Sequence, residues 1–390
     1  MPFFSFLLNS YEDKDFLHSL RNIDSNISLN QKYYSKNTNL WKILTNKKNI
    51  NYLDKINIEN RKKIKKITNN ILFCLPPNIG LGDAIEYALG IKSVVDNKNL
   101  NEYGIAFVGR YKILFSKYFK LKNIYKNIIS HKDLKKYKTI FHFTLEIKSL
   151  KFQKYDRKNI EKLITNYFKT CIYRFEKKPQ NQKKIKKITI FPISNSPIRT
   201  MPINLLNYII SFFSSEYQID IILDKDSMSN FIYKKINLKK NVNCIFPQDL
   251  ESLFFIVENT SFGIFMDSGP LHFAKINNIN GILIISSVKK NILLDKFESI
   301  KTITGNYKSD YCNGPCGLTN AFYFNNKSGC YDSLSIKKNE LLKSQNIKEL
   351  QRGNLKRSYI DLITNNVNCL KSISKIKLVK MIRDNIETEL

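Results

Sequence analysis

Short, continuous runs of apolar residues alternate with longer amphipathic stretches along most of the chain. Continuous apolar runs are typical of strands in a parallel sheet covered on both faces, and a repeat of about 3.6 residues is typical of helices. The runs that predict strands cover 71–75, 104–108, 139–143, 188–191, 219–223, 242–246, 263–266 and 282–286. The stretches that predict helices cover 84–95, 111–119, 159–175, 203–213, 249–259, 271–275, 339–351 and 372–386. Strands that alternate with helices in this way predict an α/β fold.

The most informative junction follows the predicted strand 263–266, where Asp267-Ser268-Gly269-Pro270 leads into a helix. Pro270 suits the first helical position because the amide there needs no partner. The other first-turn amides and the helix dipole favour an anion. Asp267, Ser268 and His272 add polar side chains at the carboxyl end of a strand, where open α/β sheets bind ligands. We therefore predict a ligand-binding turn; an ordinary turn that Asp267 or Ser268 only caps is the alternative.

A second polar turn, with Gly80, Gly82 and Asp83, separates the first apolar strand from the first helix. Glycines allow the backbone to approach a ligand closely. The turn lacks the third glycine and the downstream acid of a dinucleotide fingerprint, and it does not match a P-loop. Asp83 is therefore either a functional carboxylate at the mouth of the sheet or a residue that only caps the helix.

A third polar loop covers 192–202 and ends where the helix 203–213 begins. Ser194, Asn195 and Arg199 gather hydrogen-bond donors and one permanent cation in this loop, which suits a diphosphate. The alternative is an arginine that is simply solvated.

Two basic runs, 61–66 and 183–187, divide the chain, and each precedes an apolar strand. We predict a basic N-terminal extension (1–68), two Rossmann-like domains (69–176 and 177–345) and a C-terminal helical tail (346–390).

The formal charge is +31, from 64 lysine and arginine residues against 33 aspartate and glutamate residues. Such a charge attracts nucleic acids, acidic lipids, nucleotide diphosphates and anionic glycans. The chain is also rich in Asn, Ile and Lys, a bias of AT-rich coding that raises lysine without selecting a partner. The basic runs are short and no RNP, zinc-finger or recognition-helix pattern accompanies them, so no nucleic-acid partner is expected.

The seven cysteines are scattered, which suits a reducing compartment better than a disulfide framework. A metal finger of Cys312, Cys316, Cys330 and Cys369 is an alternative to free thiols. The spacing between the first two is not the usual C-x2-C, and no histidine is nearby, so we predict no metal site.

The apolar N-terminal run has no basic region before it and no small-residue cleavage site after it, so it does not predict a signal peptide. No segment approaches the roughly 18 apolar residues of a membrane span. We expect a cytoplasmic protein whose basic surface allows peripheral contact with the cytoplasmic face of an inner membrane.

Taken together, three loops resemble the ADP-heptose:lipopolysaccharide heptosyltransferase family, glycosyltransferase family 9. The family's G-[IL]-G-D turn matches Gly80-Leu81-Gly82-Asp83, and its D-[ST]-G-P-x-H-x-A block is intact at 267–274. The family's S/T-rich loop ending in K-x-W-P is similar to 194–202, and its cysteine-bearing C-terminal loop is similar to the segment around Cys312 and Cys316. The resemblance covers about residues 70 to 340.

The resemblance implies a GT-B architecture, in which two Rossmann-like domains face each other across a cleft, with the acceptor on the N-terminal one and a nucleotide-sugar on the C-terminal one. Asp83 matches the family's catalytic base, which takes a proton from the acceptor hydroxyl in an inverting transfer. The donor diphosphate would be held by Ser194, Asn195, Arg199 and the amides at Ser268-Gly269, while Asp267 would contact the donor sugar and His272 would order the turn. The implied donor is an ADP-linked heptose, the implied acceptor is an anionic glycolipid or glycan of the lipopolysaccharide core, and no cofactor is implied.

Two residues depart from the family pattern, because Arg199 stands where the family has lysine and Met201 where it has tryptophan. Both departures bear on the identity of the donor. Two related functions stay open: an autotransporter-type protein O-heptosyltransferase with a metal-bearing cysteine finger, and a non-catalytic relative that binds glycans or nucleotides.

Overall fold

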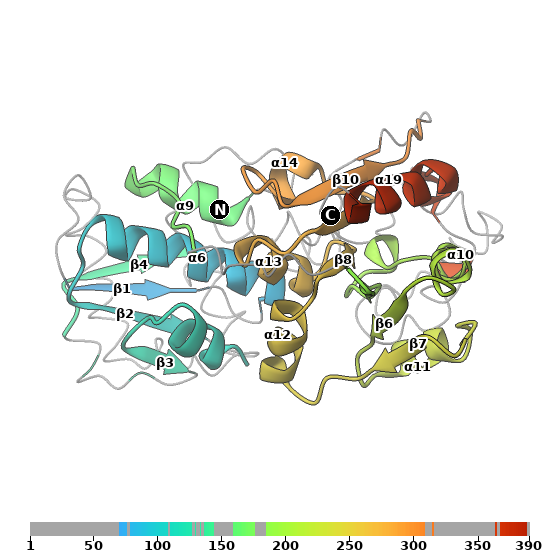
Figure 1. Ribbon diagram of the computed structural model, residues 1–390. Helices are drawn as coiled ribbons and strands as arrows, with labels where there is room; N and C mark the ends of the chain where they lie inside the picture. The colour runs from blue at the N-terminus through green and yellow to red at the C-terminus, as the bar shows by residue number, and fades with distance from the viewer. Residues whose placement is uncertain are drawn as a thin grey trace, which may run out of the picture. The chain divides into compact units, whose positions relative to one another are not determined.

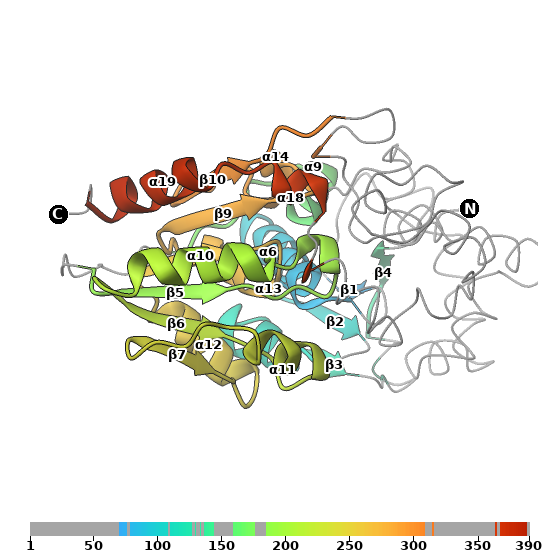
Figure 2. The same ribbon diagram turned by 90° about the vertical axis from the view of Figure 1, so that its right-hand side faces the viewer.

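The computed structural model describes residues 70–75, 79–107, 110–126, 129, 133, 136–143, 159–175, 185–308, 314–315, 363–364 and 367–387. The described chain divides into two compact units, one ending at Arg174 and the other beginning at Phe175. Figures 1 and 2 show both as strands of parallel sheets covered by helices.

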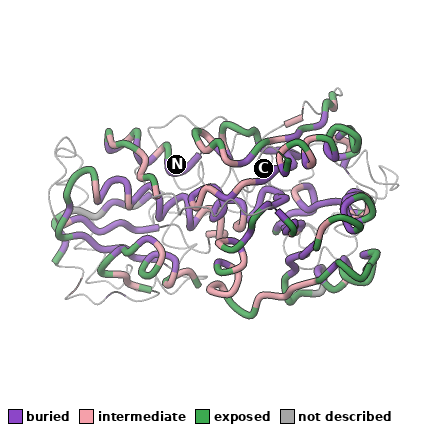
Figure 3. Tube along the Cα trace, viewed as in Figure 1, coloured by how far each residue is buried: buried purple, intermediate pink, exposed green. Residues whose placement is uncertain are grey.

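The first unit is built around a four-stranded sheet with the order β3-β2-β1-β4, in which every neighbouring pair is parallel. Its elements are β1 (Ile71–Cys74), α6 (Leu81–Asn97), β2 (Tyr103–Phe107), the π-helix η1 (Leu114–Tyr118), β3 (Ile124–Lys126), β4 (Thr139–His142) and α9 (Ile160–Phe168). Strands β1 and β2 are buried along their whole length, which explains why their sequences are continuously apolar (Figure 3).

The second unit is built around a six-stranded parallel sheet with the order β10-β9-β8-β5-β6-β7. Its strands are β5 (Lys187–Phe191), β6 (Gln218–Ile222), β7 (Val242–Ile245), β8 (Phe262–Phe265), β9 (Gly281–Ile285) and β10 (Ile300–Thr304). Its helices are η3 (Pro197–Arg199), α10 (Ile203–Phe213), α11 (Ser227–Tyr233), α12 (Leu250–Glu258), α13 (Gly269–Ile276), α14 (Lys290–Leu293), α18 (Asn368–Lys371) and α19 (Lys375–Glu387). Numbered within the unit, this order is 6-5-4-1-2-3, the Rossmann arrangement.

Successive side chains of a strand point to opposite faces, so each strand of this sheet contributes to two apolar layers. Alternate residues such as Ile190, Ile264 and Ile284 share one core with Leu206 of α10 and Ile382 of α19. Figure 2 shows α10 in front of the sheet and α12 and α13 behind it. On that other side, the rings of Phe254 (α12) and Phe273 (α13) are stacked with their centroids 3.7 Å apart.

The described part of the C-terminal tail belongs to the second unit. Its residues Ile363, Val367, Leu370, Ile373, Leu378 and Ile382 are buried in the same core as the sheet. The tail was predicted as a separate region (346–390); in the structure, the apolar side chains of its described part complete the layer next to α10.

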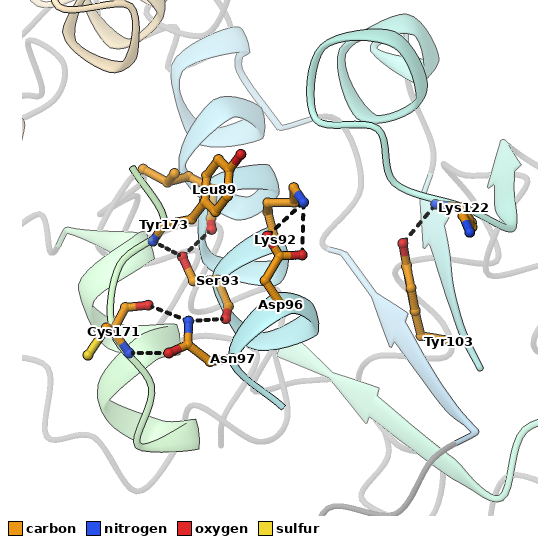
Figure 4. Close-up of polar contacts among 9 residues, drawn as sticks. All are labelled: Leu89, Lys92, Ser93, Asp96, Asn97, Tyr103, Lys122, Cys171 and Tyr173. Atoms are coloured by element: carbon orange, nitrogen blue, oxygen red, sulfur yellow. Dashed lines mark hydrogen bonds and ion pairs between the residues drawn. The ribbon is translucent and has the colours of Figure 1, made fainter. Parts of the chain in front are cut away.

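Helix α6, which carries Asp83, is fastened to α9 and to the segment that follows α9. The buried carboxylate of Glu86 accepts a hydrogen bond from the Ile160 amide at the start of α9 (3.1 Å). Near the other end of α6, the Ser93 hydroxyl accepts from the Tyr173 amide (2.8 Å) and donates to the Leu89 carbonyl (2.7 Å). Figure 4 shows this contact beside those of Asn97 with both backbone groups of Cys171. Hydrogen bonds at both ends of α6 therefore hold it against α9 and the segment that follows α9.

Several predicted boundaries differ from the structure for identifiable reasons. Helix α6 begins at Leu81, so Gly82 and Asp83 lie in its first turn instead of in a loop before it. The long helix predicted over 159–175 ends at Phe168, because Lys169 takes a left-handed conformation (φ 52°). Strands β3 and β10 were not predicted, since both lie at sheet edges and carry polar residues. The N-terminal extension and the helix predicted over 339–351 lie outside the described residues.

Among the helices that the structure describes, none combines the length and the apolar character needed to cross a membrane.

A substitution at Gly90 can test the contact between α6 and α9. A β-carbon built on Gly90 would lie 2.6 Å from Cδ1 and 2.9 Å from Cβ of Ile164 in α9. We expect Gly90→Val to lower the unfolding free energy by about 1–3 kcal/mol through overpacking. Thermal unfolding of Gly90→Val, of Ile164→Ala and of the double variant would measure the coupling between the two positions. Strictly additive losses would contradict the proposed packing.

Candidate functional site

The order of strands in the second unit creates a crevice at one place. Strands β5 and β8 are neighbours in register, with Ile190 opposite Ile264 and Phe191 opposite Phe265. The chain continues from β5 to α10 on one face of the sheet and from β8 to α13 on the other face (Figure 2). Loops that leave adjacent parallel strands toward opposite faces leave a crevice at their carboxyl ends, where α/β sheets bind ligands. The two predicted loops of this unit, after β5 and after β8, are the ones that border it.

The loop after β5 has a defined internal structure. Thr200 is fully buried, and its Oγ1 lies within hydrogen-bonding distance of the Ser194 amide and of the carbonyl groups of Ser194 and Ser196. The Met201 amide donates to the Pro192 carbonyl (2.7 Å). Ser194 is buried and Asn195 is exposed, so of these two predicted ligands only the Asn195 side chain lies at the surface.

Arg199 joins this loop to the turn after β8. Its Nη1 donates to the backbone carbonyl of Asp267 (3.1 Å) and lies 3.2 Å from Oδ2 of the Asp267 carboxylate. The Arg199 side chain is 15% exposed and that of Asp267 is 3% exposed, so the pair is shielded from water. The structure therefore brings the predicted cation to the predicted ligand-binding turn, and the interpretation of Arg199 as a merely solvated residue is wrong.

The turn after β8 presents the amino end of α13. Ser268 is the N-cap residue and Gly269 the first helical residue, with Pro270 directly after it. The Ser268 side chain makes no capping hydrogen bond, and its Oγ donates instead to the Met266 carbonyl (3.3 Å). The first-turn amides of a helix have no acceptor within the helix, so this end of α13 favours an anion. The interpretation of the turn as one that only caps the helix through Ser268 is not supported.

His272 lies one turn into α13 and is 1% exposed. Its Nε2 is 3.9 Å from Oδ1 of Asp267, on the carboxylate that also contacts Arg199. His272 and Asp267 are thus buried neighbours, and the ordering role expected for His272 stays a prediction.

The first unit places Asp83 at a similar edge. The order β3-β2-β1-β4 puts β1 between two strands, and the chain leaves β1 through Gly80 into α6. Gly80 is the N-cap residue in an extended conformation, and Asp83 lies in the first turn, partly exposed. Its carboxylate lies over Gly80, because a β-carbon on Gly80 would be 3.5 Å from Asp83 Oδ2. Asp83 is therefore favoured by the helix dipole without being the N-cap residue.

Tyr111 and Arg110 belong to the surroundings of Asp83 but were not predicted from the sequence. Burial raises the pKa of Tyr111, the Arg110 guanidinium opposes this rise, and the negative charge of Asp83 adds to it. Both residues follow β2, the neighbour of β1, so only the strand order could have identified them. Tyr111 thus interacts electrostatically with the predicted base, and Arg110 interacts with Tyr111.

Asp224 directly follows the predicted strand 219–223. It is exposed two residues past β6, which pairs with β5, so it lies at the same edge of the sheet as Arg199. Its amide donates to the Ser229 hydroxyl (3.0 Å), which fixes the turn there. An exposed carboxylate at this edge can accept hydrogen bonds from sugar hydroxyls.

Most of the cysteines of the alternative metal finger lie outside the described residues. Cys312, Cys316 and Cys330 lie there, whereas Cys369 is described and half-buried. Burial raises the pKa of Cys74 to about 12 and that of Cys244 to about 11, so both are inert thiols. In the part of the chain that the structure describes, no three His, Cys, Asp or Glu side chains group as metal ligands.

The Arg199–Asp267 pair can be tested without a ligand. We expect Arg199→Met to lower the unfolding free energy by about 3 kcal/mol, because it leaves the buried Asp267 carboxylate without its guanidinium partner. Adding Asp267→Asn should recover part of this loss. The control is Arg383→Met, which removes the exposed pair with Glu216 and should cost at most about 1 kcal/mol. Chemical denaturation measures all three, and equal effects of the two arginine substitutions would contradict a buried pair.

No protein-family model and no curated protein matches the sequence. The structure is similar to solved structures of heptosyltransferases and of glycosyltransferase family 9. The family 9 glycosyltransferase from Veillonella parvula has 12% identity and a TM-score of 0.47, over 82% of this chain and 97% of that one. The ADP-heptose lipopolysaccharide heptosyltransferase II of E. coli has 12% identity and a TM-score of 0.44, over 60% of this chain and 90% of that one. The dodecameric, iron-containing glycosyltransferase TibC of enterotoxigenic E. coli has 12% identity and a TM-score of 0.43, over 83% of this chain and 80% of that one. These similarities concern the α/β architecture with parallel sheets.

Proposed function

We propose that the protein is an inverting glycosyltransferase that moves a sugar, a heptose, from an ADP-linked donor to a hydroxyl of a lipopolysaccharide-core or other glycan acceptor. The observation that carries the proposal is the crevice between β5 and β8, which has the amino end of α13 and the Arg199–Asp267 pair at its border. This is a site for an anion held beside a carboxylate. A nucleotide-sugar offers both a diphosphate and sugar hydroxyls.

The donor diphosphate would be bound by amides more than by side chains. The Ser268-Gly269 amides at the start of α13 and the backbone of the loop from Ser194 to Arg199 supply preorganised donors. The exposed Asn195 amide group and the Arg199 guanidinium add hydrogen bonds and positive charge. Asp267 accepts from the donor sugar, and Asp224 accepts from the ribose hydroxyls.

Asp83 would act as the general base. As the acceptor oxygen attacks the anomeric carbon, its proton passes to the Asp83 carboxylate, and the bond between that carbon and the diphosphate oxygen breaks. The diphosphate leaves with both bonding electrons, and the configuration at the anomeric carbon inverts. One carboxylate is enough for a single displacement. The Tyr111 hydroxyl, which interacts electrostatically with Asp83 and with Arg110, would help to orient the acceptor.

Charge on the leaving diphosphate would be stabilised by the α13 dipole and Arg199, so we propose transfer without a divalent metal. We also propose a cytoplasmic location, with an anionic glycolipid or glycan as the acceptor. The formal charge of +31 supports an anionic partner and peripheral contact with the inner membrane.

Asp83→Asn keeps the shape of the side chain and removes its basicity. We expect it to lower the rate of transfer by about 10²–10⁴-fold, the usual contribution of a general base, with nucleotide affinity unchanged. Release of nucleoside diphosphate in the presence of acceptor measures the rate. The matched control is Asp96→Asn on the same helix, which removes only the surface pair with Lys92. Full activity of the Asp83 variant would exclude this residue as the base.

A thermal-shift screen of ADP-, GDP- and UDP-sugars, with and without EDTA, tests the donor site. We expect an ADP-sugar at 100 times its Kd to stabilise the protein by about 2.7 kcal/mol. EDTA should leave this shift unchanged. No shift with any of the three nucleotide classes would contradict the proposal, and a shift that EDTA removes would contradict metal-free binding.

A further inference from the structure

The loop between β5 and α10 depends on one buried side chain that cannot itself touch a ligand. Thr200 is 0% exposed. Its Oγ1 accepts a hydrogen bond from the Ser194 amide (3.1 Å). The single hydroxyl hydrogen is directed at two carbonyl groups, those of Ser194 (3.1 Å) and Ser196 (3.0 Å). One hydroxyl therefore binds both backbone groups of Ser194 and a third group of the same loop.

These bonds close the segment from Ser194 to Thr200 into a ring. Inside the ring, the Arg199 amide donates to the Ser196 carbonyl (3.1 Å) and the Thr200 amide donates to the Pro197 carbonyl (3.3 Å). Pro197 and Ile198 are the buried apolar side chains of the segment, and Ile198 belongs to the hydrophobic core of the unit. The conformation of the segment is thus supported by these two side chains and by the hydrogen bonds that converge on Thr200.

The ring fixes Arg199 relative to Ser194 and Asn195. Arg199 directly precedes Thr200 and reaches Asp267 on the neighbouring turn. If the ring opened, the loop would have to be ordered again each time a ligand bound, and the entropy of ordering would reduce affinity. A loop that is ordered before binding does not have this cost.

We propose that Thr200 is a positioning residue, which holds the loop after β5 in the conformation that binds the diphosphate of a nucleotide. This inference rests on the proposed function, since it names the group that stabilises the donor loop. It goes beyond that function because Thr200 acts only through the backbone of Ser194 and Ser196.

The test compares two substitutions that separate the hydroxyl from the rest of the side chain. Thr200→Val keeps the shape and removes the hydroxyl, whereas Thr200→Ser keeps the hydroxyl. The control pair is Thr165→Val and Thr165→Ser in the first unit, where a buried hydroxyl donates to the Glu161 carbonyl (2.9 Å). The Thr165 variants report what the loss of a buried threonine hydroxyl does to the protein in general.

We expect Thr200→Val to raise the Kd for ADP, measured by calorimetry, about tenfold, which corresponds to the loss of roughly one or two hydrogen bonds. The KM for the donor should rise by the same factor, while the KM for the acceptor should not change. Thr200→Ser should stay within about threefold of the wild type. Thr165→Val should lower the melting temperature without changing the Kd. Wild-type affinity in Thr200→Val, or equal losses in Thr200→Val and Thr165→Val, would overturn the inference.

A second measurement needs no variant. In the protein without nucleotide, hydrogen exchange at the Ser194 amide should be slow and exchange at the exposed Asn195 should be fast. Fast exchange at Ser194 would show that the ring forms only on binding and would overturn preorganisation. If the wild-type protein binds no nucleotide, both the proposed function and this inference are contradicted. If the wild type binds nucleotide and Thr200→Val has no effect, only the inference is contradicted.

Discussion

The parallel pairing of β5 with β8 is the constraint on which the second unit depends. Because these strands lie side by side in register, their carboxyl ends reach the same level, and the rings of Phe191 and Phe265 stack beneath that edge with centroids 5.0 Å apart. The helices that follow them lie on opposite faces, so the chain itself leaves the edge uncovered there. The position of the candidate site therefore follows from topology before any side chain is considered.

The Arg199–Asp267 pair then connects the two borders of this crevice. A buried ion pair contributes little to stability compared with well-packed apolar residues, and its value lies in fixing geometry. Here the guanidinium contacts a carbonyl and a carboxylate of the same residue, so it fixes both the backbone and the side chain of the turn. His272 Nε2 lies 3.9 Å from the other oxygen of the same carboxylate. The crevice thus has one rigid border in α13 and one loop held against it.

The parts of the fold that the sequence predicted are those for which local chemistry and burial agree. Strands such as β1 and β8 are buried on both faces, so their residues are apolar without interruption. In β10, Lys301, Thr302 and Thr304 interrupt the apolar residues because the strand lies at an edge of the sheet. Its sequence therefore gives little indication of a strand. Asp267, Ser268 and Arg199 were predicted because they follow apolar strands. Tyr111 could not be identified in this way, since its proximity to Asp83 depends on which strands are neighbours.

The two departures from the family pattern fall on residues that hold the loop. Met201 is fully buried in the core beneath the loop, so an unbranched side chain fills the space that the pattern assigns to tryptophan. A smaller and more flexible side chain there supports the backbone less than an indole would. Arg199 in place of lysine provides a planar group that can bridge to the next turn, and Thr200 bonds the loop to itself. One apolar contact and two sets of polar contacts thus hold the loop through three consecutive residues, Arg199, Thr200 and Met201.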